Sequence, residues 1–169
     1  SSPNTKLVYE WSSKPGELAT LLREVRGATT KPLIVKLSPD FADVNEREII
    51  PAALAAGVRI VNYGNTRKVV DRRLSQGTGG LSGPGIRPVA VRMTHQVVQA
   101  VKIPVIGIGG IMCAEDALEF LIVGASAVQV GTANFIDPQA MLNVIDGLEQ
   151  FLIAEGLSDI NQVIGSLKL

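Results

Sequence analysis

The sequence predicts an α/β fold in which parallel strands alternate with helices. The clearest evidence lies in residues 103–135, IPVIGIGGIMCAEDALEFLIVGASAVQVGTANF. Two short apolar runs, Val105–Ile108 and Ala127–Val130, flank Ala114–Val123, whose apolar residues recur at helical spacing. Runs that are apolar on both faces suit parallel strands, which are buried on both sides. Because strand and helix patterns alternate four times along the chain, we predict a parallel sheet covered by helices.

The residues before this stretch supply the first elements. We predict, in order, a loop over Ser1–Trp11, a helix over Pro15–Arg26, a strand over Pro32–Leu37, a helix within Asp40–Ala56 and a weaker strand over Val58–Tyr63. Gly27 is expected to end the first helix. Pro51 predicts a kink or a late start in the second. Lys36 interrupts an otherwise apolar strand, where a lysine is costly to bury unless a partner is present.

The later elements are less regular. No clean period occurs between Arg67 and Ile86, and a loop of that length is usually functional or mobile. A third helix is predicted over Arg87–Val101. Its expected core face consists of Val91, Val97, Val98 and Val101. Two more helices follow. They are predicted at Pro138–Leu152, with the proline in the first turn, and at Ser158–Ile164, with Ser158 as the N-cap.

The composition limits the class of protein. The 169 residues fit one domain, and an apolar content of 46% can build a real core. Sixteen basic and sixteen acidic residues balance, so no nucleic-acid or anionic-membrane partner is expected. One cysteine excludes an internal disulfide and a cysteine-built metal site. With no signal peptide and no apolar run near the roughly 20 residues of a membrane span, we expect a cytoplasmic protein.

Glycines at the ends of two predicted strands indicate an anion site. Gly109 and Gly110 follow the first apolar run of the opening stretch, and Gly131 with Thr132 follows the second. Glycine lets an anion approach backbone N–H groups, and a following helix N-terminus favours negative charge. In barrels of alternating strands and helices, the last two strand-end loops often bind phosphate. We therefore expect a ligand that carries phosphate, although neither glycine pair alone is specific.

Other candidate residues have two readings each. Lys36 is either a cation at the carboxyl end of a strand, where α/β folds place active sites, or a lysine that reaches solvent. Asn4, Asn65 and Thr66 either bind a planar heterocycle or serve ordinary turns. Ser2 is either a proton-transfer residue or a polar loop residue. Cys113 lies where a helix start can lower a thiol pKa, or is an indifferent position near the cap. Neither a catalytic triad nor a metal cluster can be assembled from the sequence.

Several motifs together resemble the dihydroorotate dehydrogenase family. They are SSPNT, PLIVKLSPD, the Asn65–Thr66 strand end, GGLSGPGIRPVAVRM, the stretch 103–135 and the terminal IGSLK, in the family's order and spacing. In combination GGLSG, GIGGI followed by EDALEF, and VGTANF are highly specific. The resemblance implies an α/β fold of the (β/α)8 TIM-barrel type, an FMN cofactor, and oxidation of dihydroorotate to orotate in de novo pyrimidine biosynthesis.

The resemblance also implies roles for individual residues. Lys36 matches a lysine beside the flavin ring that stabilises negative charge on the reduced cofactor. Asn4, Asn65 and Thr66 match groups that hold the pyrimidine and its carboxylate. Ser2 matches the catalytic base that removes the C5 proton while hydride passes from C6 to flavin N5. The remaining matches form the cradle of the flavin phosphate: Gly83, Gly109, Gly110, Gly131 and Thr132.

The chain also departs from the family pattern. SSPNT resembles the serine-base branch, whereas GGLSGPGIRP, GTANF and IGSLK resemble the soluble branch that pairs with an iron–sulphur flavoprotein, so the electron acceptor stays open. Residues 58–78 are atypical, with Arg59, Asn62 and Tyr63 in place of a more apolar strand.

The length implies a partial barrel. A complete barrel of this type takes about 250 residues, so residues 1–169 correspond to its C-terminal half, with about the last four β-α units. We expect a fragment of a full enzyme, ahead of one half of a two-chain barrel or a domain closed by homo-oligomerisation. The functional alternatives are a non-catalytic half-barrel that binds phosphate or flavin, and an FMN oxidoreductase with another substrate.

Overall fold

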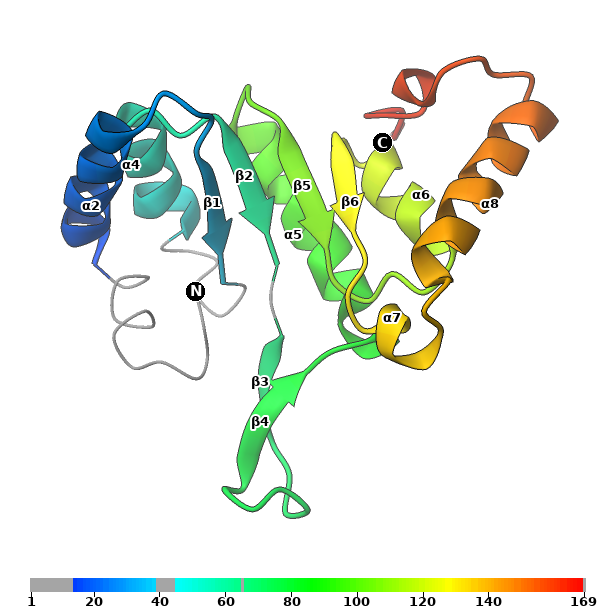
Figure 1. The fold of residues 1–169 in the computed structure, drawn as a ribbon, viewed down its shortest axis with the longest axis horizontal. Helices are drawn as coiled ribbons and strands as arrows, with labels where there is room; N and C mark the ends of the chain where they lie inside the picture. The colour runs from blue at the N-terminus through cyan, green and yellow to red at the C-terminus, as the bar shows by residue number, and fades with distance from the viewer. Residues whose placement is uncertain (1–13, 39–44, 65, 169) are drawn as a thin grey trace.

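A four-stranded parallel sheet organises the protein (Figure 1). The computed structural model describes residues 14–38, 45–64 and 66–168. The strands are β1 (Ile34–Leu37), β2 (Ile60–Tyr63), β5 (Val105–Ile108) and β6 (Ala127–Gln129), and they pair in that order. Strands that neighbour each other in both sequence and space are what a segment of a (β/α) barrel requires. The predicted α/β class with parallel strands is therefore confirmed.

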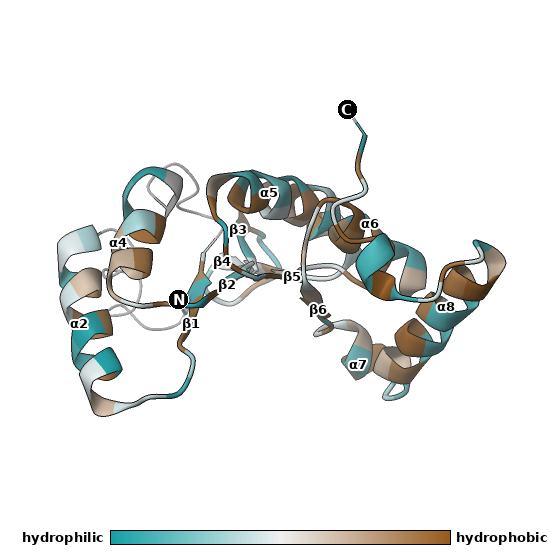
Figure 2. Ribbon diagram, turned by 90° about the horizontal axis from the view of Figure 1, so that it is seen from above, coloured by the Kyte–Doolittle hydropathy of each residue, from teal (hydrophilic) through white to brown (hydrophobic). Residues whose placement is uncertain are grey.

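Helices follow or precede each strand. They are α2 (Pro15–Ala28), α4 (Ile50–Ala55), α5 (Arg87–Ala100), α6 (Ala114–Ile122), the short α7 (Ala133–Ile136) and α8 (Ala140–Ala154). Viewed from above, α5 and α6 lie on one side of the sheet (Figure 2). None of the helices in the described residues is long and apolar enough to cross a membrane.

The two faces of the sheet differ in burial. Val35, Leu37, Val61, Tyr63 and Val105 are all buried on the face that meets the helices. Their strand neighbours point the other way, and there Ile34 keeps 55% of its surface exposed and Lys36 is also exposed. Because side chains alternate along a strand, this pattern shows that one face of the sheet is packed. The other, which we call the open face, is covered unevenly: its β1 positions are exposed, whereas Asn62 of β2 is buried.

The core on the packed face divides into clusters. The largest joins β1, β2 and β5 to α4 and α5 through residues that include Ile49, Ile50, Tyr63, Met93 and Val97. A second is built around Phe120 of α6, which lies under Gly107 of β5. A third packs α6 against the C-terminal segment. On α5 the predicted core face was partly right: Val97 is buried, Val91, Val98 and Val101 are partly buried, and Met93 carries much of the contact.

Several predicted boundaries in the first half need correction. The first helix does not end at Gly27 but runs to Ala28, because Gly27 lacks the left-handed conformation of a C-cap and Thr29 leaves the helix extended. The second helical region enters as a π-helix over Asn45–Ile49 and becomes α-helical at Ile50. Pro51, at which a kink or a late start was predicted, lies in the first turn of α4, where the π-helical segment gives way to the α-helix. The earlier residues of that predicted helix, 40–44, lie outside the described residues.

The expectation of an irregular segment between Arg67 and Ile86 was wrong. Two strands, β3 (Arg67–Val70) and β4 (Thr78–Leu81), pair antiparallel as a hairpin that extends away from the sheet (Figure 1). Gly79 and Gly80 hide β4 from a pattern search, because glycine is depleted in strands. At Gly79 an added Cβ would lie 2.7 Å from Cδ1 of Leu74, the end of an exposed side chain that can rotate away.

Two C-terminal boundaries also differ from the prediction. The helix α8 begins at Ala140 rather than Pro138, after Asp137, whose carboxylate accepts a hydrogen bond from the Gln139 N–H at 2.9 Å. The last short helix is a 3₁₀ turn over Ile160–Gln162, and its N-cap is Asp159 rather than Ser158. Asp159 accepts from the Asn161 N–H at 2.8 Å, and a carboxylate with this geometry satisfies the cap directly.

We predict that Gly107→Ala destabilises the fold. The added Cβ would lie 2.5 Å from Cδ1 and 3.1 Å from Cβ of the fully buried Phe120. Overpacking of this kind costs about 1–3 kcal/mol of the free energy of unfolding. The measurement is urea denaturation with an unchanged m-value.

Gly27→Ala in α2 is the matched control. A Cβ there meets nothing within 4 Å, and replacing a helical glycine should add roughly 0.5–1 kcal/mol of stability. If the two variants unfold at the same urea concentration, the contact between β5 and Phe120 does not limit residue size at position 107.

Candidate functional site

A pocket lies where the ends of several strands meet their following loops. Its volume is about 280 Å³. It is lined by Lys36, Thr66, Ser82, Gly83, Ile86, Ile108, Gly109, Gly110, Gly131, Thr132 and Phe135. These residues come from β1, β5 and the segments that follow β2, β4, β5 and β6, so the pocket sits at the carboxyl ends of the parallel strands. That edge is where α/β folds place their ligands.

The pocket gathers every sequence-predicted site residue that the structure describes. Lys36, Thr66 and the glycine positions with Thr132 all line this one cavity, although they are spread over about a hundred residues of sequence. Three predicted residues, Ser2, Asn4 and Asn65, lie outside the described residues. Three lining residues were missed: Ile86, Ile108 and Phe135. Ser82, which also lines the pocket, belongs to the glycine-rich GGLSG motif that was a candidate for cofactor contact.

The missed residues carried little signal in the sequence. Ile86 and Ile108 look like ordinary core positions. Phe135 is different because 93% of its surface is exposed. The one sequence signal for Phe135 as a pocket residue is its position four residues after Gly131, at the end of a glycine-ended strand.

Three glycines in the pocket adopt a backbone conformation that other residues avoid. Gly83 has φ 77°, Gly109 φ 133° and Gly110 φ 78°. At Gly110 an added Cβ would also lie 2.7 Å from the carbonyl oxygen of Gly83. Gly131 differs, because a Cβ there meets nothing within 4 Å. The loops that contain Gly83 and Gly110 therefore pack so closely that glycine is needed at position 110. The loop that contains Gly131 has free space beside its backbone.

Comparison with known proteins shows the family to which the chain is related. The family model described as dihydroorotate dehydrogenase matches residues 1–152. The chain belongs to the dihydroorotate dehydrogenase family. The family resemblance drawn from the motifs is thus confirmed, and the four described β-α units fit a partial TIM barrel of this family.

Curated relatives of this family align along the whole chain. The catalytic subunit of dihydroorotate dehydrogenase B (NAD(+)) from Trichlorobacter lovleyi is 47% identical over 178 aligned positions, which cover 99% of this chain and 57% of the relative. The protein of the same name from Geotalea uraniireducens is 48% identical with the same coverage, and that from Lachnoclostridium phytofermentans is 44% identical over 99% of this chain and 58% of the relative. The chain therefore spans little more than half the length of these relatives.

The donor set of the pocket is compatible with a ligand that carries phosphate, such as FMN. Glycine-rich backbone and the hydroxyls of Ser82 and Thr132 suit phosphate, and Lys36 adds a cation. Ile86 and Ile108 offer apolar contact. Ligand pockets usually measure about 300–1,000 Å³, so a cavity of about 280 Å³ lies just below this range and would hold only part of a ligand of the size of FMN. Among the described residues, no group of histidine, cysteine or acidic side chains could hold a metal ion.

Beside Lys36, the open face carries a polar pair that the motifs did not indicate. Asn62 of β2 is in register with Lys36, and its Nδ2 donates to Oε1 of Gln129 on β6 at 2.6 Å. Asn62 is 5% exposed, and its Oδ1 has no hydrogen-bond partner among the described residues. The sequence did contain one sign of this pair. Asn62 is a polar residue within an apolar strand, and it belongs to the segment 58–78 that departs from the family pattern.

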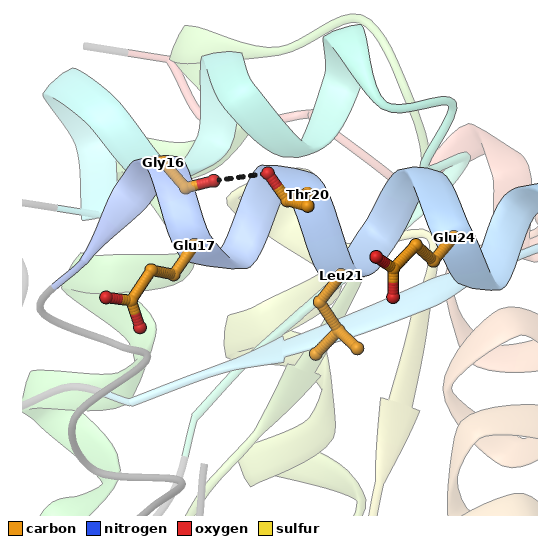
Figure 3. A pocket seen from close by; sticks show the side chains of 5 residues that line it. All are labelled: Gly16, Glu17, Thr20, Leu21 and Glu24. Carbon is orange, nitrogen blue, oxygen red and sulfur yellow. Dashed lines mark hydrogen bonds between the residues drawn. The ribbon is translucent and has the colours of Figure 1, made fainter.

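A second hollow lies on the surface of α2 (Figure 3). It is lined by Gly16, Glu17, Thr20, Leu21 and Glu24, all from one helix. Glu17 pairs with Lys14 at 3.1 Å, and the Thr20 hydroxyl donates to the Gly16 carbonyl at 3.1 Å. These contacts lie at the start of the helix, and among the described residues no second element contributes a group. The hollow therefore offers no chemistry comparable to the strand-end pocket.

Cys113 precedes α6 but does not behave as an activated thiol. Burial of the sulfur and a hydrogen bond to Glu115 raise the thiol pKa above its ordinary value, although the residue as a whole is exposed. The same contact lowers the pKa of the Glu115 carboxyl. The possibility that the helix start lowers this thiol pKa is therefore not realised.

We predict that Glu115→Gln makes Cys113 more reactive. Loss of the carboxylate removes both a hydrogen bond and a negative charge that favour the neutral thiol, so the thiol pKa falls and the thiolate fraction at a given pH rises. Alkylation by iodoacetamide near neutral pH, followed by mass spectrometry, should be faster than in the unaltered chain. Because the chain has one cysteine, the label is unambiguous. Glu155→Gln should leave the rate unchanged, and an equal rate in both variants would refute the role of Glu115.

Proposed function

We propose that the chain is the FMN-binding C-terminal half of a dihydroorotate dehydrogenase barrel that oxidises dihydroorotate to orotate in the cytoplasm. The observation that carries this proposal is the convergence of Lys36, Thr66 and the glycine-rich loops in one strand-end pocket. Membership of the family and 44–48% identity to curated catalytic subunits support it.

The two sides of the pocket are proposed to bind different parts of the ligand. Gly83, Gly109, Gly110, Gly131 and Thr132 form the side that would hold the phosphate through backbone N–H groups and a hydroxyl. Positive φ angles at Gly83, Gly109 and Gly110 preorganise that backbone. Preorganisation matters because groups that need no rearrangement on binding pay less conformational entropy.

Lys36 and Thr66 form the other side, at the ends of β1 and β2. Bound FMN would supply the hydride acceptor for C6 of dihydroorotate. The Lys36 ammonium, placed at that side of the pocket, stabilises negative charge that develops next to it. Thr66, with Asn65 and Asn4, orients the pyrimidine and its carboxylate. Ser2 takes the C5 proton and, because a serine hydroxyl is a weak base, passes it on to neighbouring groups.

Further protein is proposed to pack against the two outer strands of the sheet and its open face. Within the described residues, β1 and β6 each pair with one strand only. Near β6 several apolar side chains are exposed: Phe135, Ile136, Met141, Leu142 and Ile145. We propose that a first barrel half, or otherwise a second copy of the chain, covers these surfaces. The relatives are named as catalytic subunits, which supports an electron-transfer subunit, such as an iron–sulphur flavoprotein, as a further partner.

A second candidate is an FMN oxidoreductase that acts on another substrate. The observation in its favour is Asn62, a buried amide beside Lys36 in a strand that departs from the family pattern. A non-catalytic half-barrel that binds flavin or phosphate is the alternative from a different class.

The visible spectrum of the purified chain, reconstituted with FMN, separates these functions. We expect a flavin spectrum that bleaches anaerobically on addition of dihydroorotate. Bound flavin that does not bleach would favour the second candidate or a binding role. A colourless chain that cannot be reconstituted would overturn both flavin functions.

We further predict that Lys36→Ala slows flavin reduction by dihydroorotate about 100-fold, the usual cost of removing one electrostatic stabiliser of a transition state. Lys36 is exposed, so the free energy of unfolding should change by less than about 0.5 kcal/mol. Anaerobic stopped-flow absorbance measures the rate. Lys102→Ala, an exposed lysine that does not line the pocket, is the control and should reduce at the original rate. Equal rates in the two variants would remove Lys36 from the site.

A further inference from the structure

An ion pair behind the pocket joins the helices that follow two of its loops. Arg87 is the first residue of α5, and its Nη1 donates to Oδ1 of Asp116 in the first turn of α6. Asp116 is only 5% exposed. Its other oxygen, Oδ2, accepts from the Met112 N–H at 2.8 Å. One buried carboxylate therefore ties the start of α5 to the loop that runs from β5 into α6.

The same loop is packed tightly against the start of α5. A Cβ on Gly109 would lie 2.9 Å from the Ala90 side chain, and a Cβ on Gly110 would lie 2.9 Å from Cβ and N of Arg87. Gly110 also abuts the Gly83 carbonyl. The glycine contacts thus fix one end of the loop and the Asp116–Met112 hydrogen bond fixes the other.

The charges in this cluster indicate that Arg87 acts on the loop rather than on a ligand. Its guanidinium faces two carboxylates, Asp116 and Glu119, and Nε lies 3.3 Å from Glu119 Oε2 without hydrogen-bond geometry. Arg87 does not line the pocket. Without Arg87, a buried carboxylate would stand uncompensated behind the glycines, where its charge would repel an incoming phosphate.

We propose that Arg87 and Asp116 are positioning residues that hold Gly109–Met112 against Gly83, and thereby set the phosphate cradle. This inference rests on the proposed flavin function for its ligand, but its structural part stands on the unliganded chain. It assigns a role to Asp116 within the EDALEF motif that differs from the favourable first-turn charge expected of any acidic residue at a helix N-terminus.

Flavin affinities test the role in ligand binding. Dissociation constants for FMN and for riboflavin, which lacks the phosphate, are measured by flavin fluorescence in the full chain. Asp116→Asn should lower the preference for FMN over riboflavin at least about tenfold, or about 1.4 kcal/mol, with riboflavin affinity within twofold of the original. Arg87→Lys, which keeps the charge but loses the planar fork, should lower the preference less than Arg87→Ala.

Glu119→Gln is the matched control because it removes the exposed partner of the same arginine. Its preference for FMN should stay within twofold of the original. A purely structural role predicts that FMN and riboflavin weaken together, and this result would overturn the proposal. An unchanged preference in both Asp116→Asn and Arg87→Ala would do the same.

Amide hydrogen exchange on the unliganded chain separates this inference from the proposed function. If the chain binds neither flavin, the proposed function fails, while exchange still decides whether the ion pair holds the loop. In Asp116→Asn, the amides of residues 109–112 should exchange about tenfold faster, with those of β2 and β5 unchanged. Unaltered exchange in the loop overturns the positioning role. If Asp116→Asn does not fold, Arg87→Lys provides the same comparison.

Discussion

The alternation of side chains along four parallel strands is the constraint on which the rest of the structure depends. It sends Val35, Leu37, Val61 and Tyr63 to the helices and leaves Ile34 on the open face. A parallel sheet is normally buried on both sides, and here the described residues cover one. The packed face holds most of the buried apolar side chains of these units, and the exposed positions of the open face are where we propose that further protein packs.

The position of the pocket follows from the parallel direction of the strands. Because all four strands run the same way, their carboxyl ends share one edge, and the loops that follow them meet there. Chemistry-bearing residues that are far apart in sequence, such as Lys36 and Thr132, then line one cavity. The helices that begin after these loops are joined by the Arg87–Asp116 pair, so packing behind the pocket and geometry inside it are parts of one arrangement.

Sequence patterns predicted the features that repeat locally. Apolar runs located the strands within two residues, and glycine-ended strands located the pocket. Features that depend on a distant partner were not visible: the Arg87–Asp116 pair spans 29 residues, and the Asn62–Gln129 pair spans 67. The hairpin was missed for a different reason, since Gly79 and Gly80 have no side chains to show the alternation of a strand. Positions 2, 4 and 65 lie outside the described residues, so their roles stay predictions.

Asn62 shows how the open face and the pocket are coupled. Its amide nitrogen donates a hydrogen bond to Gln129 across the intervening strand β5. This pair of polar side chains lies on the same face of the sheet as Lys36. A carbonyl oxygen buried without a donor costs about 1–3 kcal/mol, and Asn62 Oδ1 is in that state among the described residues. Because this oxygen is itself buried, a ligand ring or protein segment could satisfy it only if the residues that cover it move aside. Asn62 therefore changes the packing next to Lys36 relative to an apolar strand residue, which is the physical reason to weigh a different substrate beside dihydroorotate.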